Sequence, residues 1–99
     1  MKLSDKQRRY LAGRAHPLRP VVQIGAAGLT ESVTRETERA LADHELIKVR
    51  MRAADRQARD AALAELARRT ASALVHRIGH VAVLYRPRAG LPGIVIPDD

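Results

Sequence analysis

The chain has 99 residues, the size of one compact domain, and its lack of cysteine excludes a disulfide framework, a cysteine-based zinc finger and a thiol nucleophile. Its 18 Lys and Arg residues outnumber its 11 Asp and Glu residues and give a formal net charge of +7, which leaves two alternatives, a polyanionic partner such as nucleic acid or a merely soluble basic surface. The N-terminus lacks the apolar stretch of a signal peptide and no apolar run is long enough to span a bilayer, so we expect a cytoplasmic protein without membrane association.

The first expected element is a helix that runs to about Ala15. Ser4 and Asp5 are residue types that cap helix N-termini, and Pro17 and Pro20 end the helix and force an extended stretch. Basic residues recur along one face of this helix at helical spacing. They are Lys2, Lys6 and Arg9.

A short strand and a second helix follow, joined by a tight connection. The segment Val21–Ile24 is rich in β-branched residues and is expected to be a buried strand. Gly25–Gly28 then forms the connection, and Thr30 is suited to cap the second helix. The side of that helix expected to face the core carries Val33, Thr37, Ala40, Leu41 and His44.

The segment Leu46–Arg52 alternates and predicts a half-buried strand with a cationic outer face. Ile47, Val49 and Met51 are expected to point inward, and Lys48, Arg50 and Arg52 outward. Asp55 then caps a third helix that runs to about Thr70. The inward residues expected from that helix are Ala58, Ala62 and Leu66.

Two further strands, Leu74–Ile78 and Val81–Tyr85, are separated by Gly79 and His80, which is short enough for a hairpin turn. Residues 1–87 are therefore expected to form one domain, and residues 88–99 a tail in which Ile94–Ile96 either adds an edge strand or packs on the body. The order predicts an α/β two-layer fold, α-β-α-β-α-β-β, with a four-stranded mixed sheet and helices packed against one face.

The connection Gly25-Ala26-Ala27-Gly28 is the strongest candidate for a functional site. Glycines let a backbone come close to a ligand, and free amides in such a loop attract an anion. KH domains clamp nucleic-acid backbone with a GXXG loop, although an ordinary strand–helix turn has the same four-residue pattern. Its place between strand and helix, beside a segment 1–28 with six basic residues and one acidic residue, favours phosphate binding. A P-loop is excluded because no Gly-Lys-Ser/Thr follows.

Other chemistry is weakly supported. The four histidines, His16, His44, His76 and His80, do not converge at metal-ligand spacing, so neither a metal nor a cofactor is expected. No serine lies beside an evident base, so no catalytic residue is assigned. The acidic residues of the second helix form either a solvated face or a contact for a protein partner.

Four blocks of sequence together resemble a known family. They are LSDKQRRYLAGRAHPLRP (3–20), VVQIGAAGLTE (21–31), HELIKV (44–49) and IGHVAVLYRP (78–87). The chain resembles the CRM domain (chloroplast RNA splicing and ribosome maturation), and more closely the stand-alone bacterial YhbY-like proteins. The resemblance covers residues 1–87. It implies a fold similar to the C-terminal domain of translation initiation factor three, and an RNA-binding protein associated with the precursor of the large ribosomal subunit.

The resemblance also implies which residues hold the RNA, with two departures from the family pattern. The GxxG loop corresponds to Gly25–Gly28, but both inner positions are alanine, which leaves only backbone donors. Thr70-Ala71-Ser72 stands where the family usually has Thr-Gly-Ala, so Ala71 lacks the left-handed freedom of a glycine at a helix end. The basic first helix of the family corresponds to Lys2, Lys6, Arg8, Arg9 and Arg14.

The leading hypothesis is that a monomer binds structured ribosomal RNA during large-subunit assembly. Lys48 and Arg50 are expected to contribute less, because their strand could turn them away from the loop. Base recognition is expected to be weak, since the chain has only two aromatic residues. The rivals are an adaptor for ribosomal proteins, which would use the acidic second helix, and a DNA-binding protein. The expected RNA-binding residues are Gly25, Ala26, Ala27, Gly28, Lys2, Lys6, Arg8, Arg9, Arg14, Arg19, Lys48 and Arg50.

Overall fold

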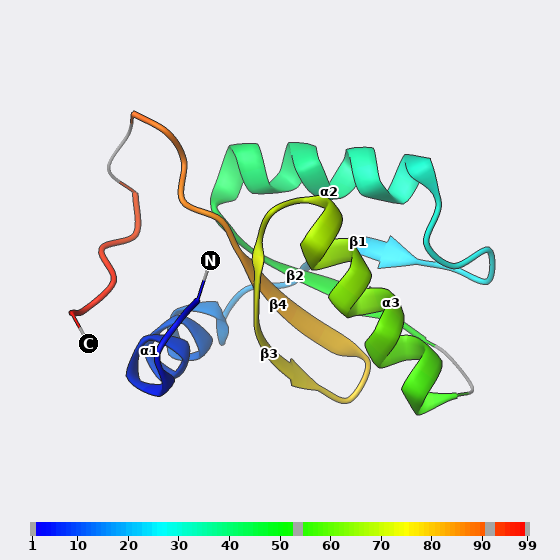
Figure 1. The fold of residues 1–99 in the computed structure, drawn as a ribbon, viewed down its shortest axis with the longest axis horizontal. Coiled ribbons are helices and arrows are strands. Elements are labelled where there is room, and N and C mark those ends of the chain that lie inside the picture. The colour runs from blue at the N-terminus through cyan, green and yellow to red at the C-terminus, as the bar shows by residue number, and fades with distance from the viewer. Residues whose placement is uncertain (1, 53–54, 91–92, 99) are drawn as a thin grey trace.

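Helices and strands alternate along the chain in the order that the sequence predicts. The computed structural model describes residues 2–52, 55–90 and 93–98 (Figure 1). The expected order and the four-stranded mixed sheet are confirmed. The elements are α1 (Asp5–Ala15), β1 (Pro20–Ile24), α2 (Glu31–His44), β2 (Leu46–Met51), α3 (Arg56–Arg69), β3 (Ala73–Ile78) and β4 (Val81–Tyr85).

The sheet has the strand order β1-β2-β4-β3. Strands β1 and β2 are parallel and are connected through α2, whereas β4 runs antiparallel to both β2 and β3. Strand β1 lies at an edge, and its Val21 and Gln23 are exposed while Val22 and Ile24 are buried. The expectation of a wholly buried strand is therefore wrong, because only one face of β1 packs against helices.

Helices α2 and α3 cover one face of the sheet and enclose the larger core. Leu41, Leu63 and Leu66 pack there against sheet residues that include Val49 and Leu84. Each of these leucines is fully buried, and such burial stabilises a fold by about 2 kcal/mol per side chain. Two residues expected to face this core, His44 and Ala58, are exposed instead.

Helix α1 packs on the opposite face of the sheet, so the expectation that all helices share one face is wrong for α1. Its Leu11 and Ala15 lie in a second cluster with Leu46, Val83 and Tyr85. Burial, and then the charge of Glu45, raise the pKa of the Tyr85 phenol. Because α1 packs over only one end of the outer face of the sheet, the other end of that face is open.

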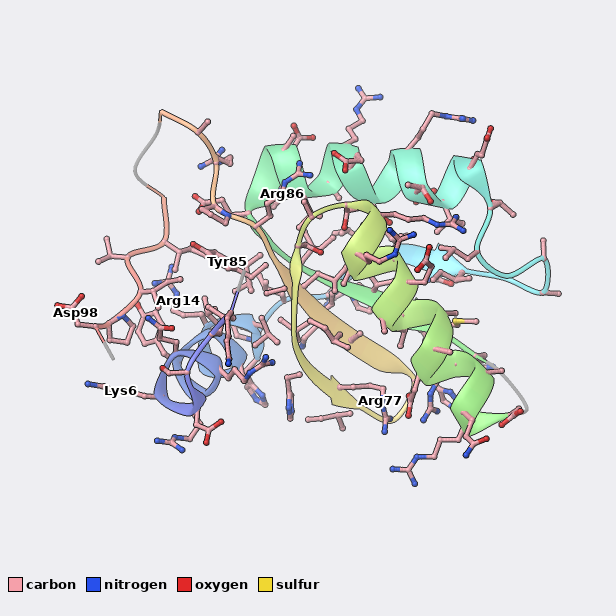
Figure 2. All side chains as sticks on the ribbon, in the orientation of Figure 1. Lys6, Arg14, Arg77, Tyr85, Arg86 and Asp98 are labelled. Atoms are coloured by element: carbon pink, nitrogen blue, oxygen red, sulfur yellow. The ribbon has the colours of Figure 1, made fainter. Side chains whose placement is uncertain are left out.

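The C-terminal segment packs on the body and adds no strand among its described residues. Ile94 and Ile96 rest against the α1 cluster, and Gln7 Nε2 on α1 donates a hydrogen bond of 3.1 Å to the carbonyl of Pro97. Of the two alternatives for Ile94–Ile96, the packed one is therefore correct. Figure 2 shows Asp98 at the end of this segment, close to α1.

Each helix begins at a residue suited to cap it, and α3 ends in a strained turn. Ser4, Thr30 and Asp55 accept hydrogen bonds from backbone amides of the first turns of α1, α2 and α3. After α3, the amide of Ser72 donates to the carbonyl of Ala67, which closes a Schellman motif. The motif holds Ala71 at φ 51°, in the left-handed region that disfavours residues with a Cβ.

We expect the substitution Ala71→Gly to stabilise the protein by about 1 kcal/mol, because it relieves a left-handed penalty of about 1–2 kcal/mol at some entropic cost in the unfolded chain. A thermal melt should rise by about 5 °C. Ala64→Gly, at an exposed mid-helix position of α3, serves as the control and should lower stability by about 1 kcal/mol. Equal losses in both variants would contradict this account of Ala71.

Candidate nucleic-acid interface

The Gly25–Gly28 loop is a closed turn at the end of β1. The amide of Gly28 donates a hydrogen bond of 3.0 Å to the carbonyl of Gly25. Gly28 has a φ of 74°, which glycine adopts without the penalty that a Cβ would bring. Ala26 and Ala27 form the exposed tip. A ligand therefore meets small side chains and bare backbone.

Some amides of the loop and of the adjoining helix are already engaged. Thr30 Oγ1 accepts from the amide of Val33 at 3.1 Å, so the cap uses one donor at the start of α2, and the turn uses that of Gly28. Within the described part of the chain, the amides of Ala26 and Ala27 donate to no other backbone group. Both amides are therefore available to a phosphate.

Arg50 of β2 and Arg52, which directly follows this strand, complete a hollow beside the loop. The parallel register pairs Gln23 with Arg50 and Ile24 with Met51, so the ends of both strands lie together. Arg50 and Arg52 line this hollow with Gly25 and Ala26. Arg50 thus lies beside the loop, although the sequence analysis expected it to contribute less because its strand could turn it away. Arg52, absent from the expected RNA-binding residues, shares the site, and the alternation of β2 was the signal for it.

Helix α1 does not lie beside the loop, although it is close in sequence. Figure 1 shows α1 and the Gly25–Gly28 loop toward opposite ends of the long axis, along which the Cα atoms extend 37 Å. Lys2, Lys6 and Arg9 are exposed, and Figure 2 shows Lys6 projecting away from the sheet. The expected basic residues therefore form two groups rather than one footprint.

Two of the other expected RNA-binding residues, Arg8 and Arg14, have contacts within the fold. Arg8 Nη1 donates to the carbonyls of Leu74 at 2.6 Å and Val75 at 3.3 Å, which ties α1 to β3. Arg14 donates to the hydroxyl of Tyr10 at 3.0 Å and lies 5.9 Å from its ring centre.

Lys48 Nζ donates to the carbonyl of His16 at 3.1 Å and so lies between the two basic groups. Arg19, an exposed residue, lines a separate hollow with Arg14, Leu18 and Val21.

The acidic helix α2 is partly neutralised within the fold. Glu38 of α2 accepts from Arg86 Nη1 at 2.8 Å, and the buried carboxylate of Glu45, the residue that follows α2, accepts from Arg88 Nε at 3.3 Å. Glu31 pairs loosely with Arg35 at 3.7 Å near the loop. The negative face available to a protein partner is therefore smaller than the sequence suggests.

The described residues also bear on metal binding and membrane insertion. They contain no cluster of three or more His, Cys, Asp or Glu side chains that could hold a metal ion. In the same ranges, no helix has the length and apolar character needed to cross a bilayer.

Comparisons with known proteins agree on one family. The model of the CRS1/YhbY (CRM) domain matches residues 3–86. An RNA-binding protein of Haemophilus influenzae is 51% identical over 85 residues, which are 86% of each chain. A probable RNA-binding protein of Pseudomonas aeruginosa is 45% identical over 86 residues, 87% of this chain and 83% of the relative.

A solved structure supports the same assignment. The solution structure of a Staphylococcus aureus protein, whose description proposes RNA binding, superposes with a TM-score of 0.84 and 33% identity, covering 97% of this chain and 100% of that one. The fold, the matched residues and the relatives agree, and the chain therefore belongs to the CRS1/YhbY (CRM) domain family.

Proposed function

We propose that this protein binds ribosomal RNA of the precursor large subunit and assists its assembly in the cytoplasm, as a binding protein rather than an enzyme and without a cofactor. The names of the relatives support RNA as the partner. The resemblance to the YhbY-like proteins supports the ribosomal particle. The formal net charge of +7 supports a polyanion.

The hollow between the Gly25–Gly28 loop and β2 is the observation that carries this proposal. Two free amides at Ala26 and Ala27 offer neutral donors, and Arg50 and Arg52 offer charge beside them. A phosphate prefers such a combination, because guanidinium groups form paired hydrogen bonds with its oxygens while backbone amides hold it in place. The absence of side-chain donors at Ala26 and Ala27 makes the grip independent of base sequence.

The exposed basic residues in α1 and just before it serve as a second contact on a larger RNA. Lys2, Lys6 and Arg9 are exposed at the other end of the long axis, so a short RNA held at the loop would not reach them. A folded ribosomal RNA would span both groups. Arg8 contributes by holding α1 on the sheet.

Co-sedimentation of the protein with ribosomal particles tests the proposal against the adaptor hypothesis. We expect the protein to sediment with precursor large subunits on a sucrose gradient and to be released by nuclease treatment, because its contacts are with RNA. Retention after complete RNA digestion would favour a contact between the remaining acidic residues of α2, such as Glu36 and Asp43, and a ribosomal protein. Crosslinking in cells followed by sequencing of the bound RNA identifies the site.

A further inference from the structure

The outer face of the sheet is open beyond the C-terminal end of α1, and register divides it into a basic half and an apolar half. One row across the four strands joins Gln23 of β1, Arg50 of β2, Val81 of β4 and Ile78 of β3. Ile78 is 68% exposed on this face. The basic half adjoins the loop, and the apolar half lies at the free edge of β3.

A second row runs parallel to the first and brings a histidine onto the same face. It joins Pro20, Lys48, Val83 and His76. The register of β3 shifts between Leu74 and His76, so two residues of β3 face one of β4 there. Without this bulge, strict alternation would turn His76 toward α3.

The second row, together with Val81 and Ile78 of the first, lines a groove of about 460 Å³ between α1 and the β3–β4 hairpin. Val81 and Val83 contribute apolar surface, while His76 and His16 contribute imidazole rings and Lys48 an ammonium group. Among the described residues, no carboxylate lines the groove. The groove thus combines apolar surface, stackable rings and positive charge, as single-stranded nucleic-acid sites do.

We propose that this groove binds an unpaired RNA segment, with bases packed over Ile78 and Val81 beside His76 and with phosphates on Lys48 and Arg50. The inference rests on the proposed RNA binding and adds a second mode to it. The loop grips backbone alone, whereas the groove requires bases that are free of pairing. The positive rim and its continuity with Arg50 favour RNA over a protein segment as the occupant.

Charge placed on the apolar half tests this proposal. Ile78→Glu should lower the affinity for a single-stranded oligoribonucleotide about tenfold, measured by fluorescence anisotropy at fixed salt. Val95→Glu is the matched control, because Val95 is 76% exposed in the C-terminal segment and the substitution changes net charge equally. This control should change affinity by less than about twofold. Both positions are exposed, so both variants should fold.

A pair of substitutions at His76 tests stacking separately. His76→Ala should weaken single-strand binding several-fold, and His76→Tyr should retain it, because a phenol ring can also stack on a base. Equal losses in the two variants would count against base stacking at this position.

A stem–loop probe separates this inference from the proposed function. Ile78→Glu should leave the affinity for a fully paired stem with a minimal loop near that of Val95→Glu, while acidic residues at Ala26 and Ala27 should weaken both probes. If Ile78→Glu matches Val95→Glu on the single strand, the groove proposal is overturned and the loop proposal stands. If Ile78→Glu loses only its association with ribosomal particles, a protein occupies the groove and the proposal is again overturned. If the unmodified protein binds neither probe, RNA binding itself fails.

Discussion

The double substitution Ala26→Asp with Ala27→Asp is expected to lower RNA affinity about a hundredfold or more, which corresponds to roughly 2.7 kcal/mol. The two residues form the exposed tip of the turn, and their amides are free to donate beside Arg50 and Arg52. Two carboxylates there would repel a phosphate and would pair with the arginines that should hold it. Binding of a labelled stem–loop RNA measures the effect.

Two controls make this result specific to the loop. Ala61→Asp with Ala64→Asp adds the same charge at exposed positions of α3, on the far side of the sheet from the open face, and should cost only a small part of the affinity. The circular-dichroism melt of the loop variant should stay close to that of the unmodified protein, because Asp is compatible with an exposed turn. Unchanged RNA affinity in a folded loop variant would refute the phosphate grip.

A milder substitution at Gly25 examines how closely RNA approaches the loop. A Cβ at Gly25 would meet no atom of the protein within 4 Å, whereas Gly28 has a positive φ that a Cβ would strain. Gly25→Ala should therefore leave the fold intact and affect only a ligand that touches the backbone. We therefore expect different roles for the two glycines: Gly25 allows close approach of the RNA, and Gly28 allows the positive φ of the turn.

Much of the fold was predictable because its local signals are strong. Ser4, Thr30 and Asp55 mark the helix starts, and the alternation of Leu46–Arg52 identifies β2 and both of its faces. Which side of α3 faces the core was not predictable in the same way. The alanines of that helix are spread around its circumference, so they give no contrast between an inner and an outer side. Ala58 was therefore assigned inward, whereas Leu63 and Ala67 face the core.

The arrangement of the candidate site was harder to predict, because closeness in sequence is not closeness in space. Lys6 and Arg9 of α1 precede Gly25 by 19 and 16 residues, yet β1 carries the chain about 16 Å away from α1, at roughly 3.3 Å per residue. Arg50 and Arg52 follow Gly28 by 22 and 24 residues, a similar separation, but they reach the loop because β1 and β2 pair in parallel. The face of the sheet that α1 covers, and the bulge that turns His76 outward, depend on tertiary packing and leave no local pattern.

The same geometry makes a quantitative prediction about which basic residues matter on a short RNA. Arg50→Ala with Arg52→Ala should weaken binding of a short stem–loop at low salt by about tenfold to a hundredfold, because two charge-assisted contacts at the loop are lost. Lys2→Ala with Lys6→Ala removes equal charge from the opposite end of the molecule and should have a much smaller effect. A larger loss from the lysine pair would restore α1 as the main contact.

Salt dependence distinguishes lost phosphate contacts from a general loss of charge. Each neutralised phosphate contributes about 0.7–0.9 to the slope of log affinity against log salt, so the arginine pair should lower that slope by about 1.4–1.8. The lysine pair should leave the slope nearly unchanged on the short stem–loop and lower it on a long ribosomal RNA that reaches both groups. Such a difference between probes is expected only if the two basic groups act as separate contacts, as their positions at opposite ends of the long axis predict.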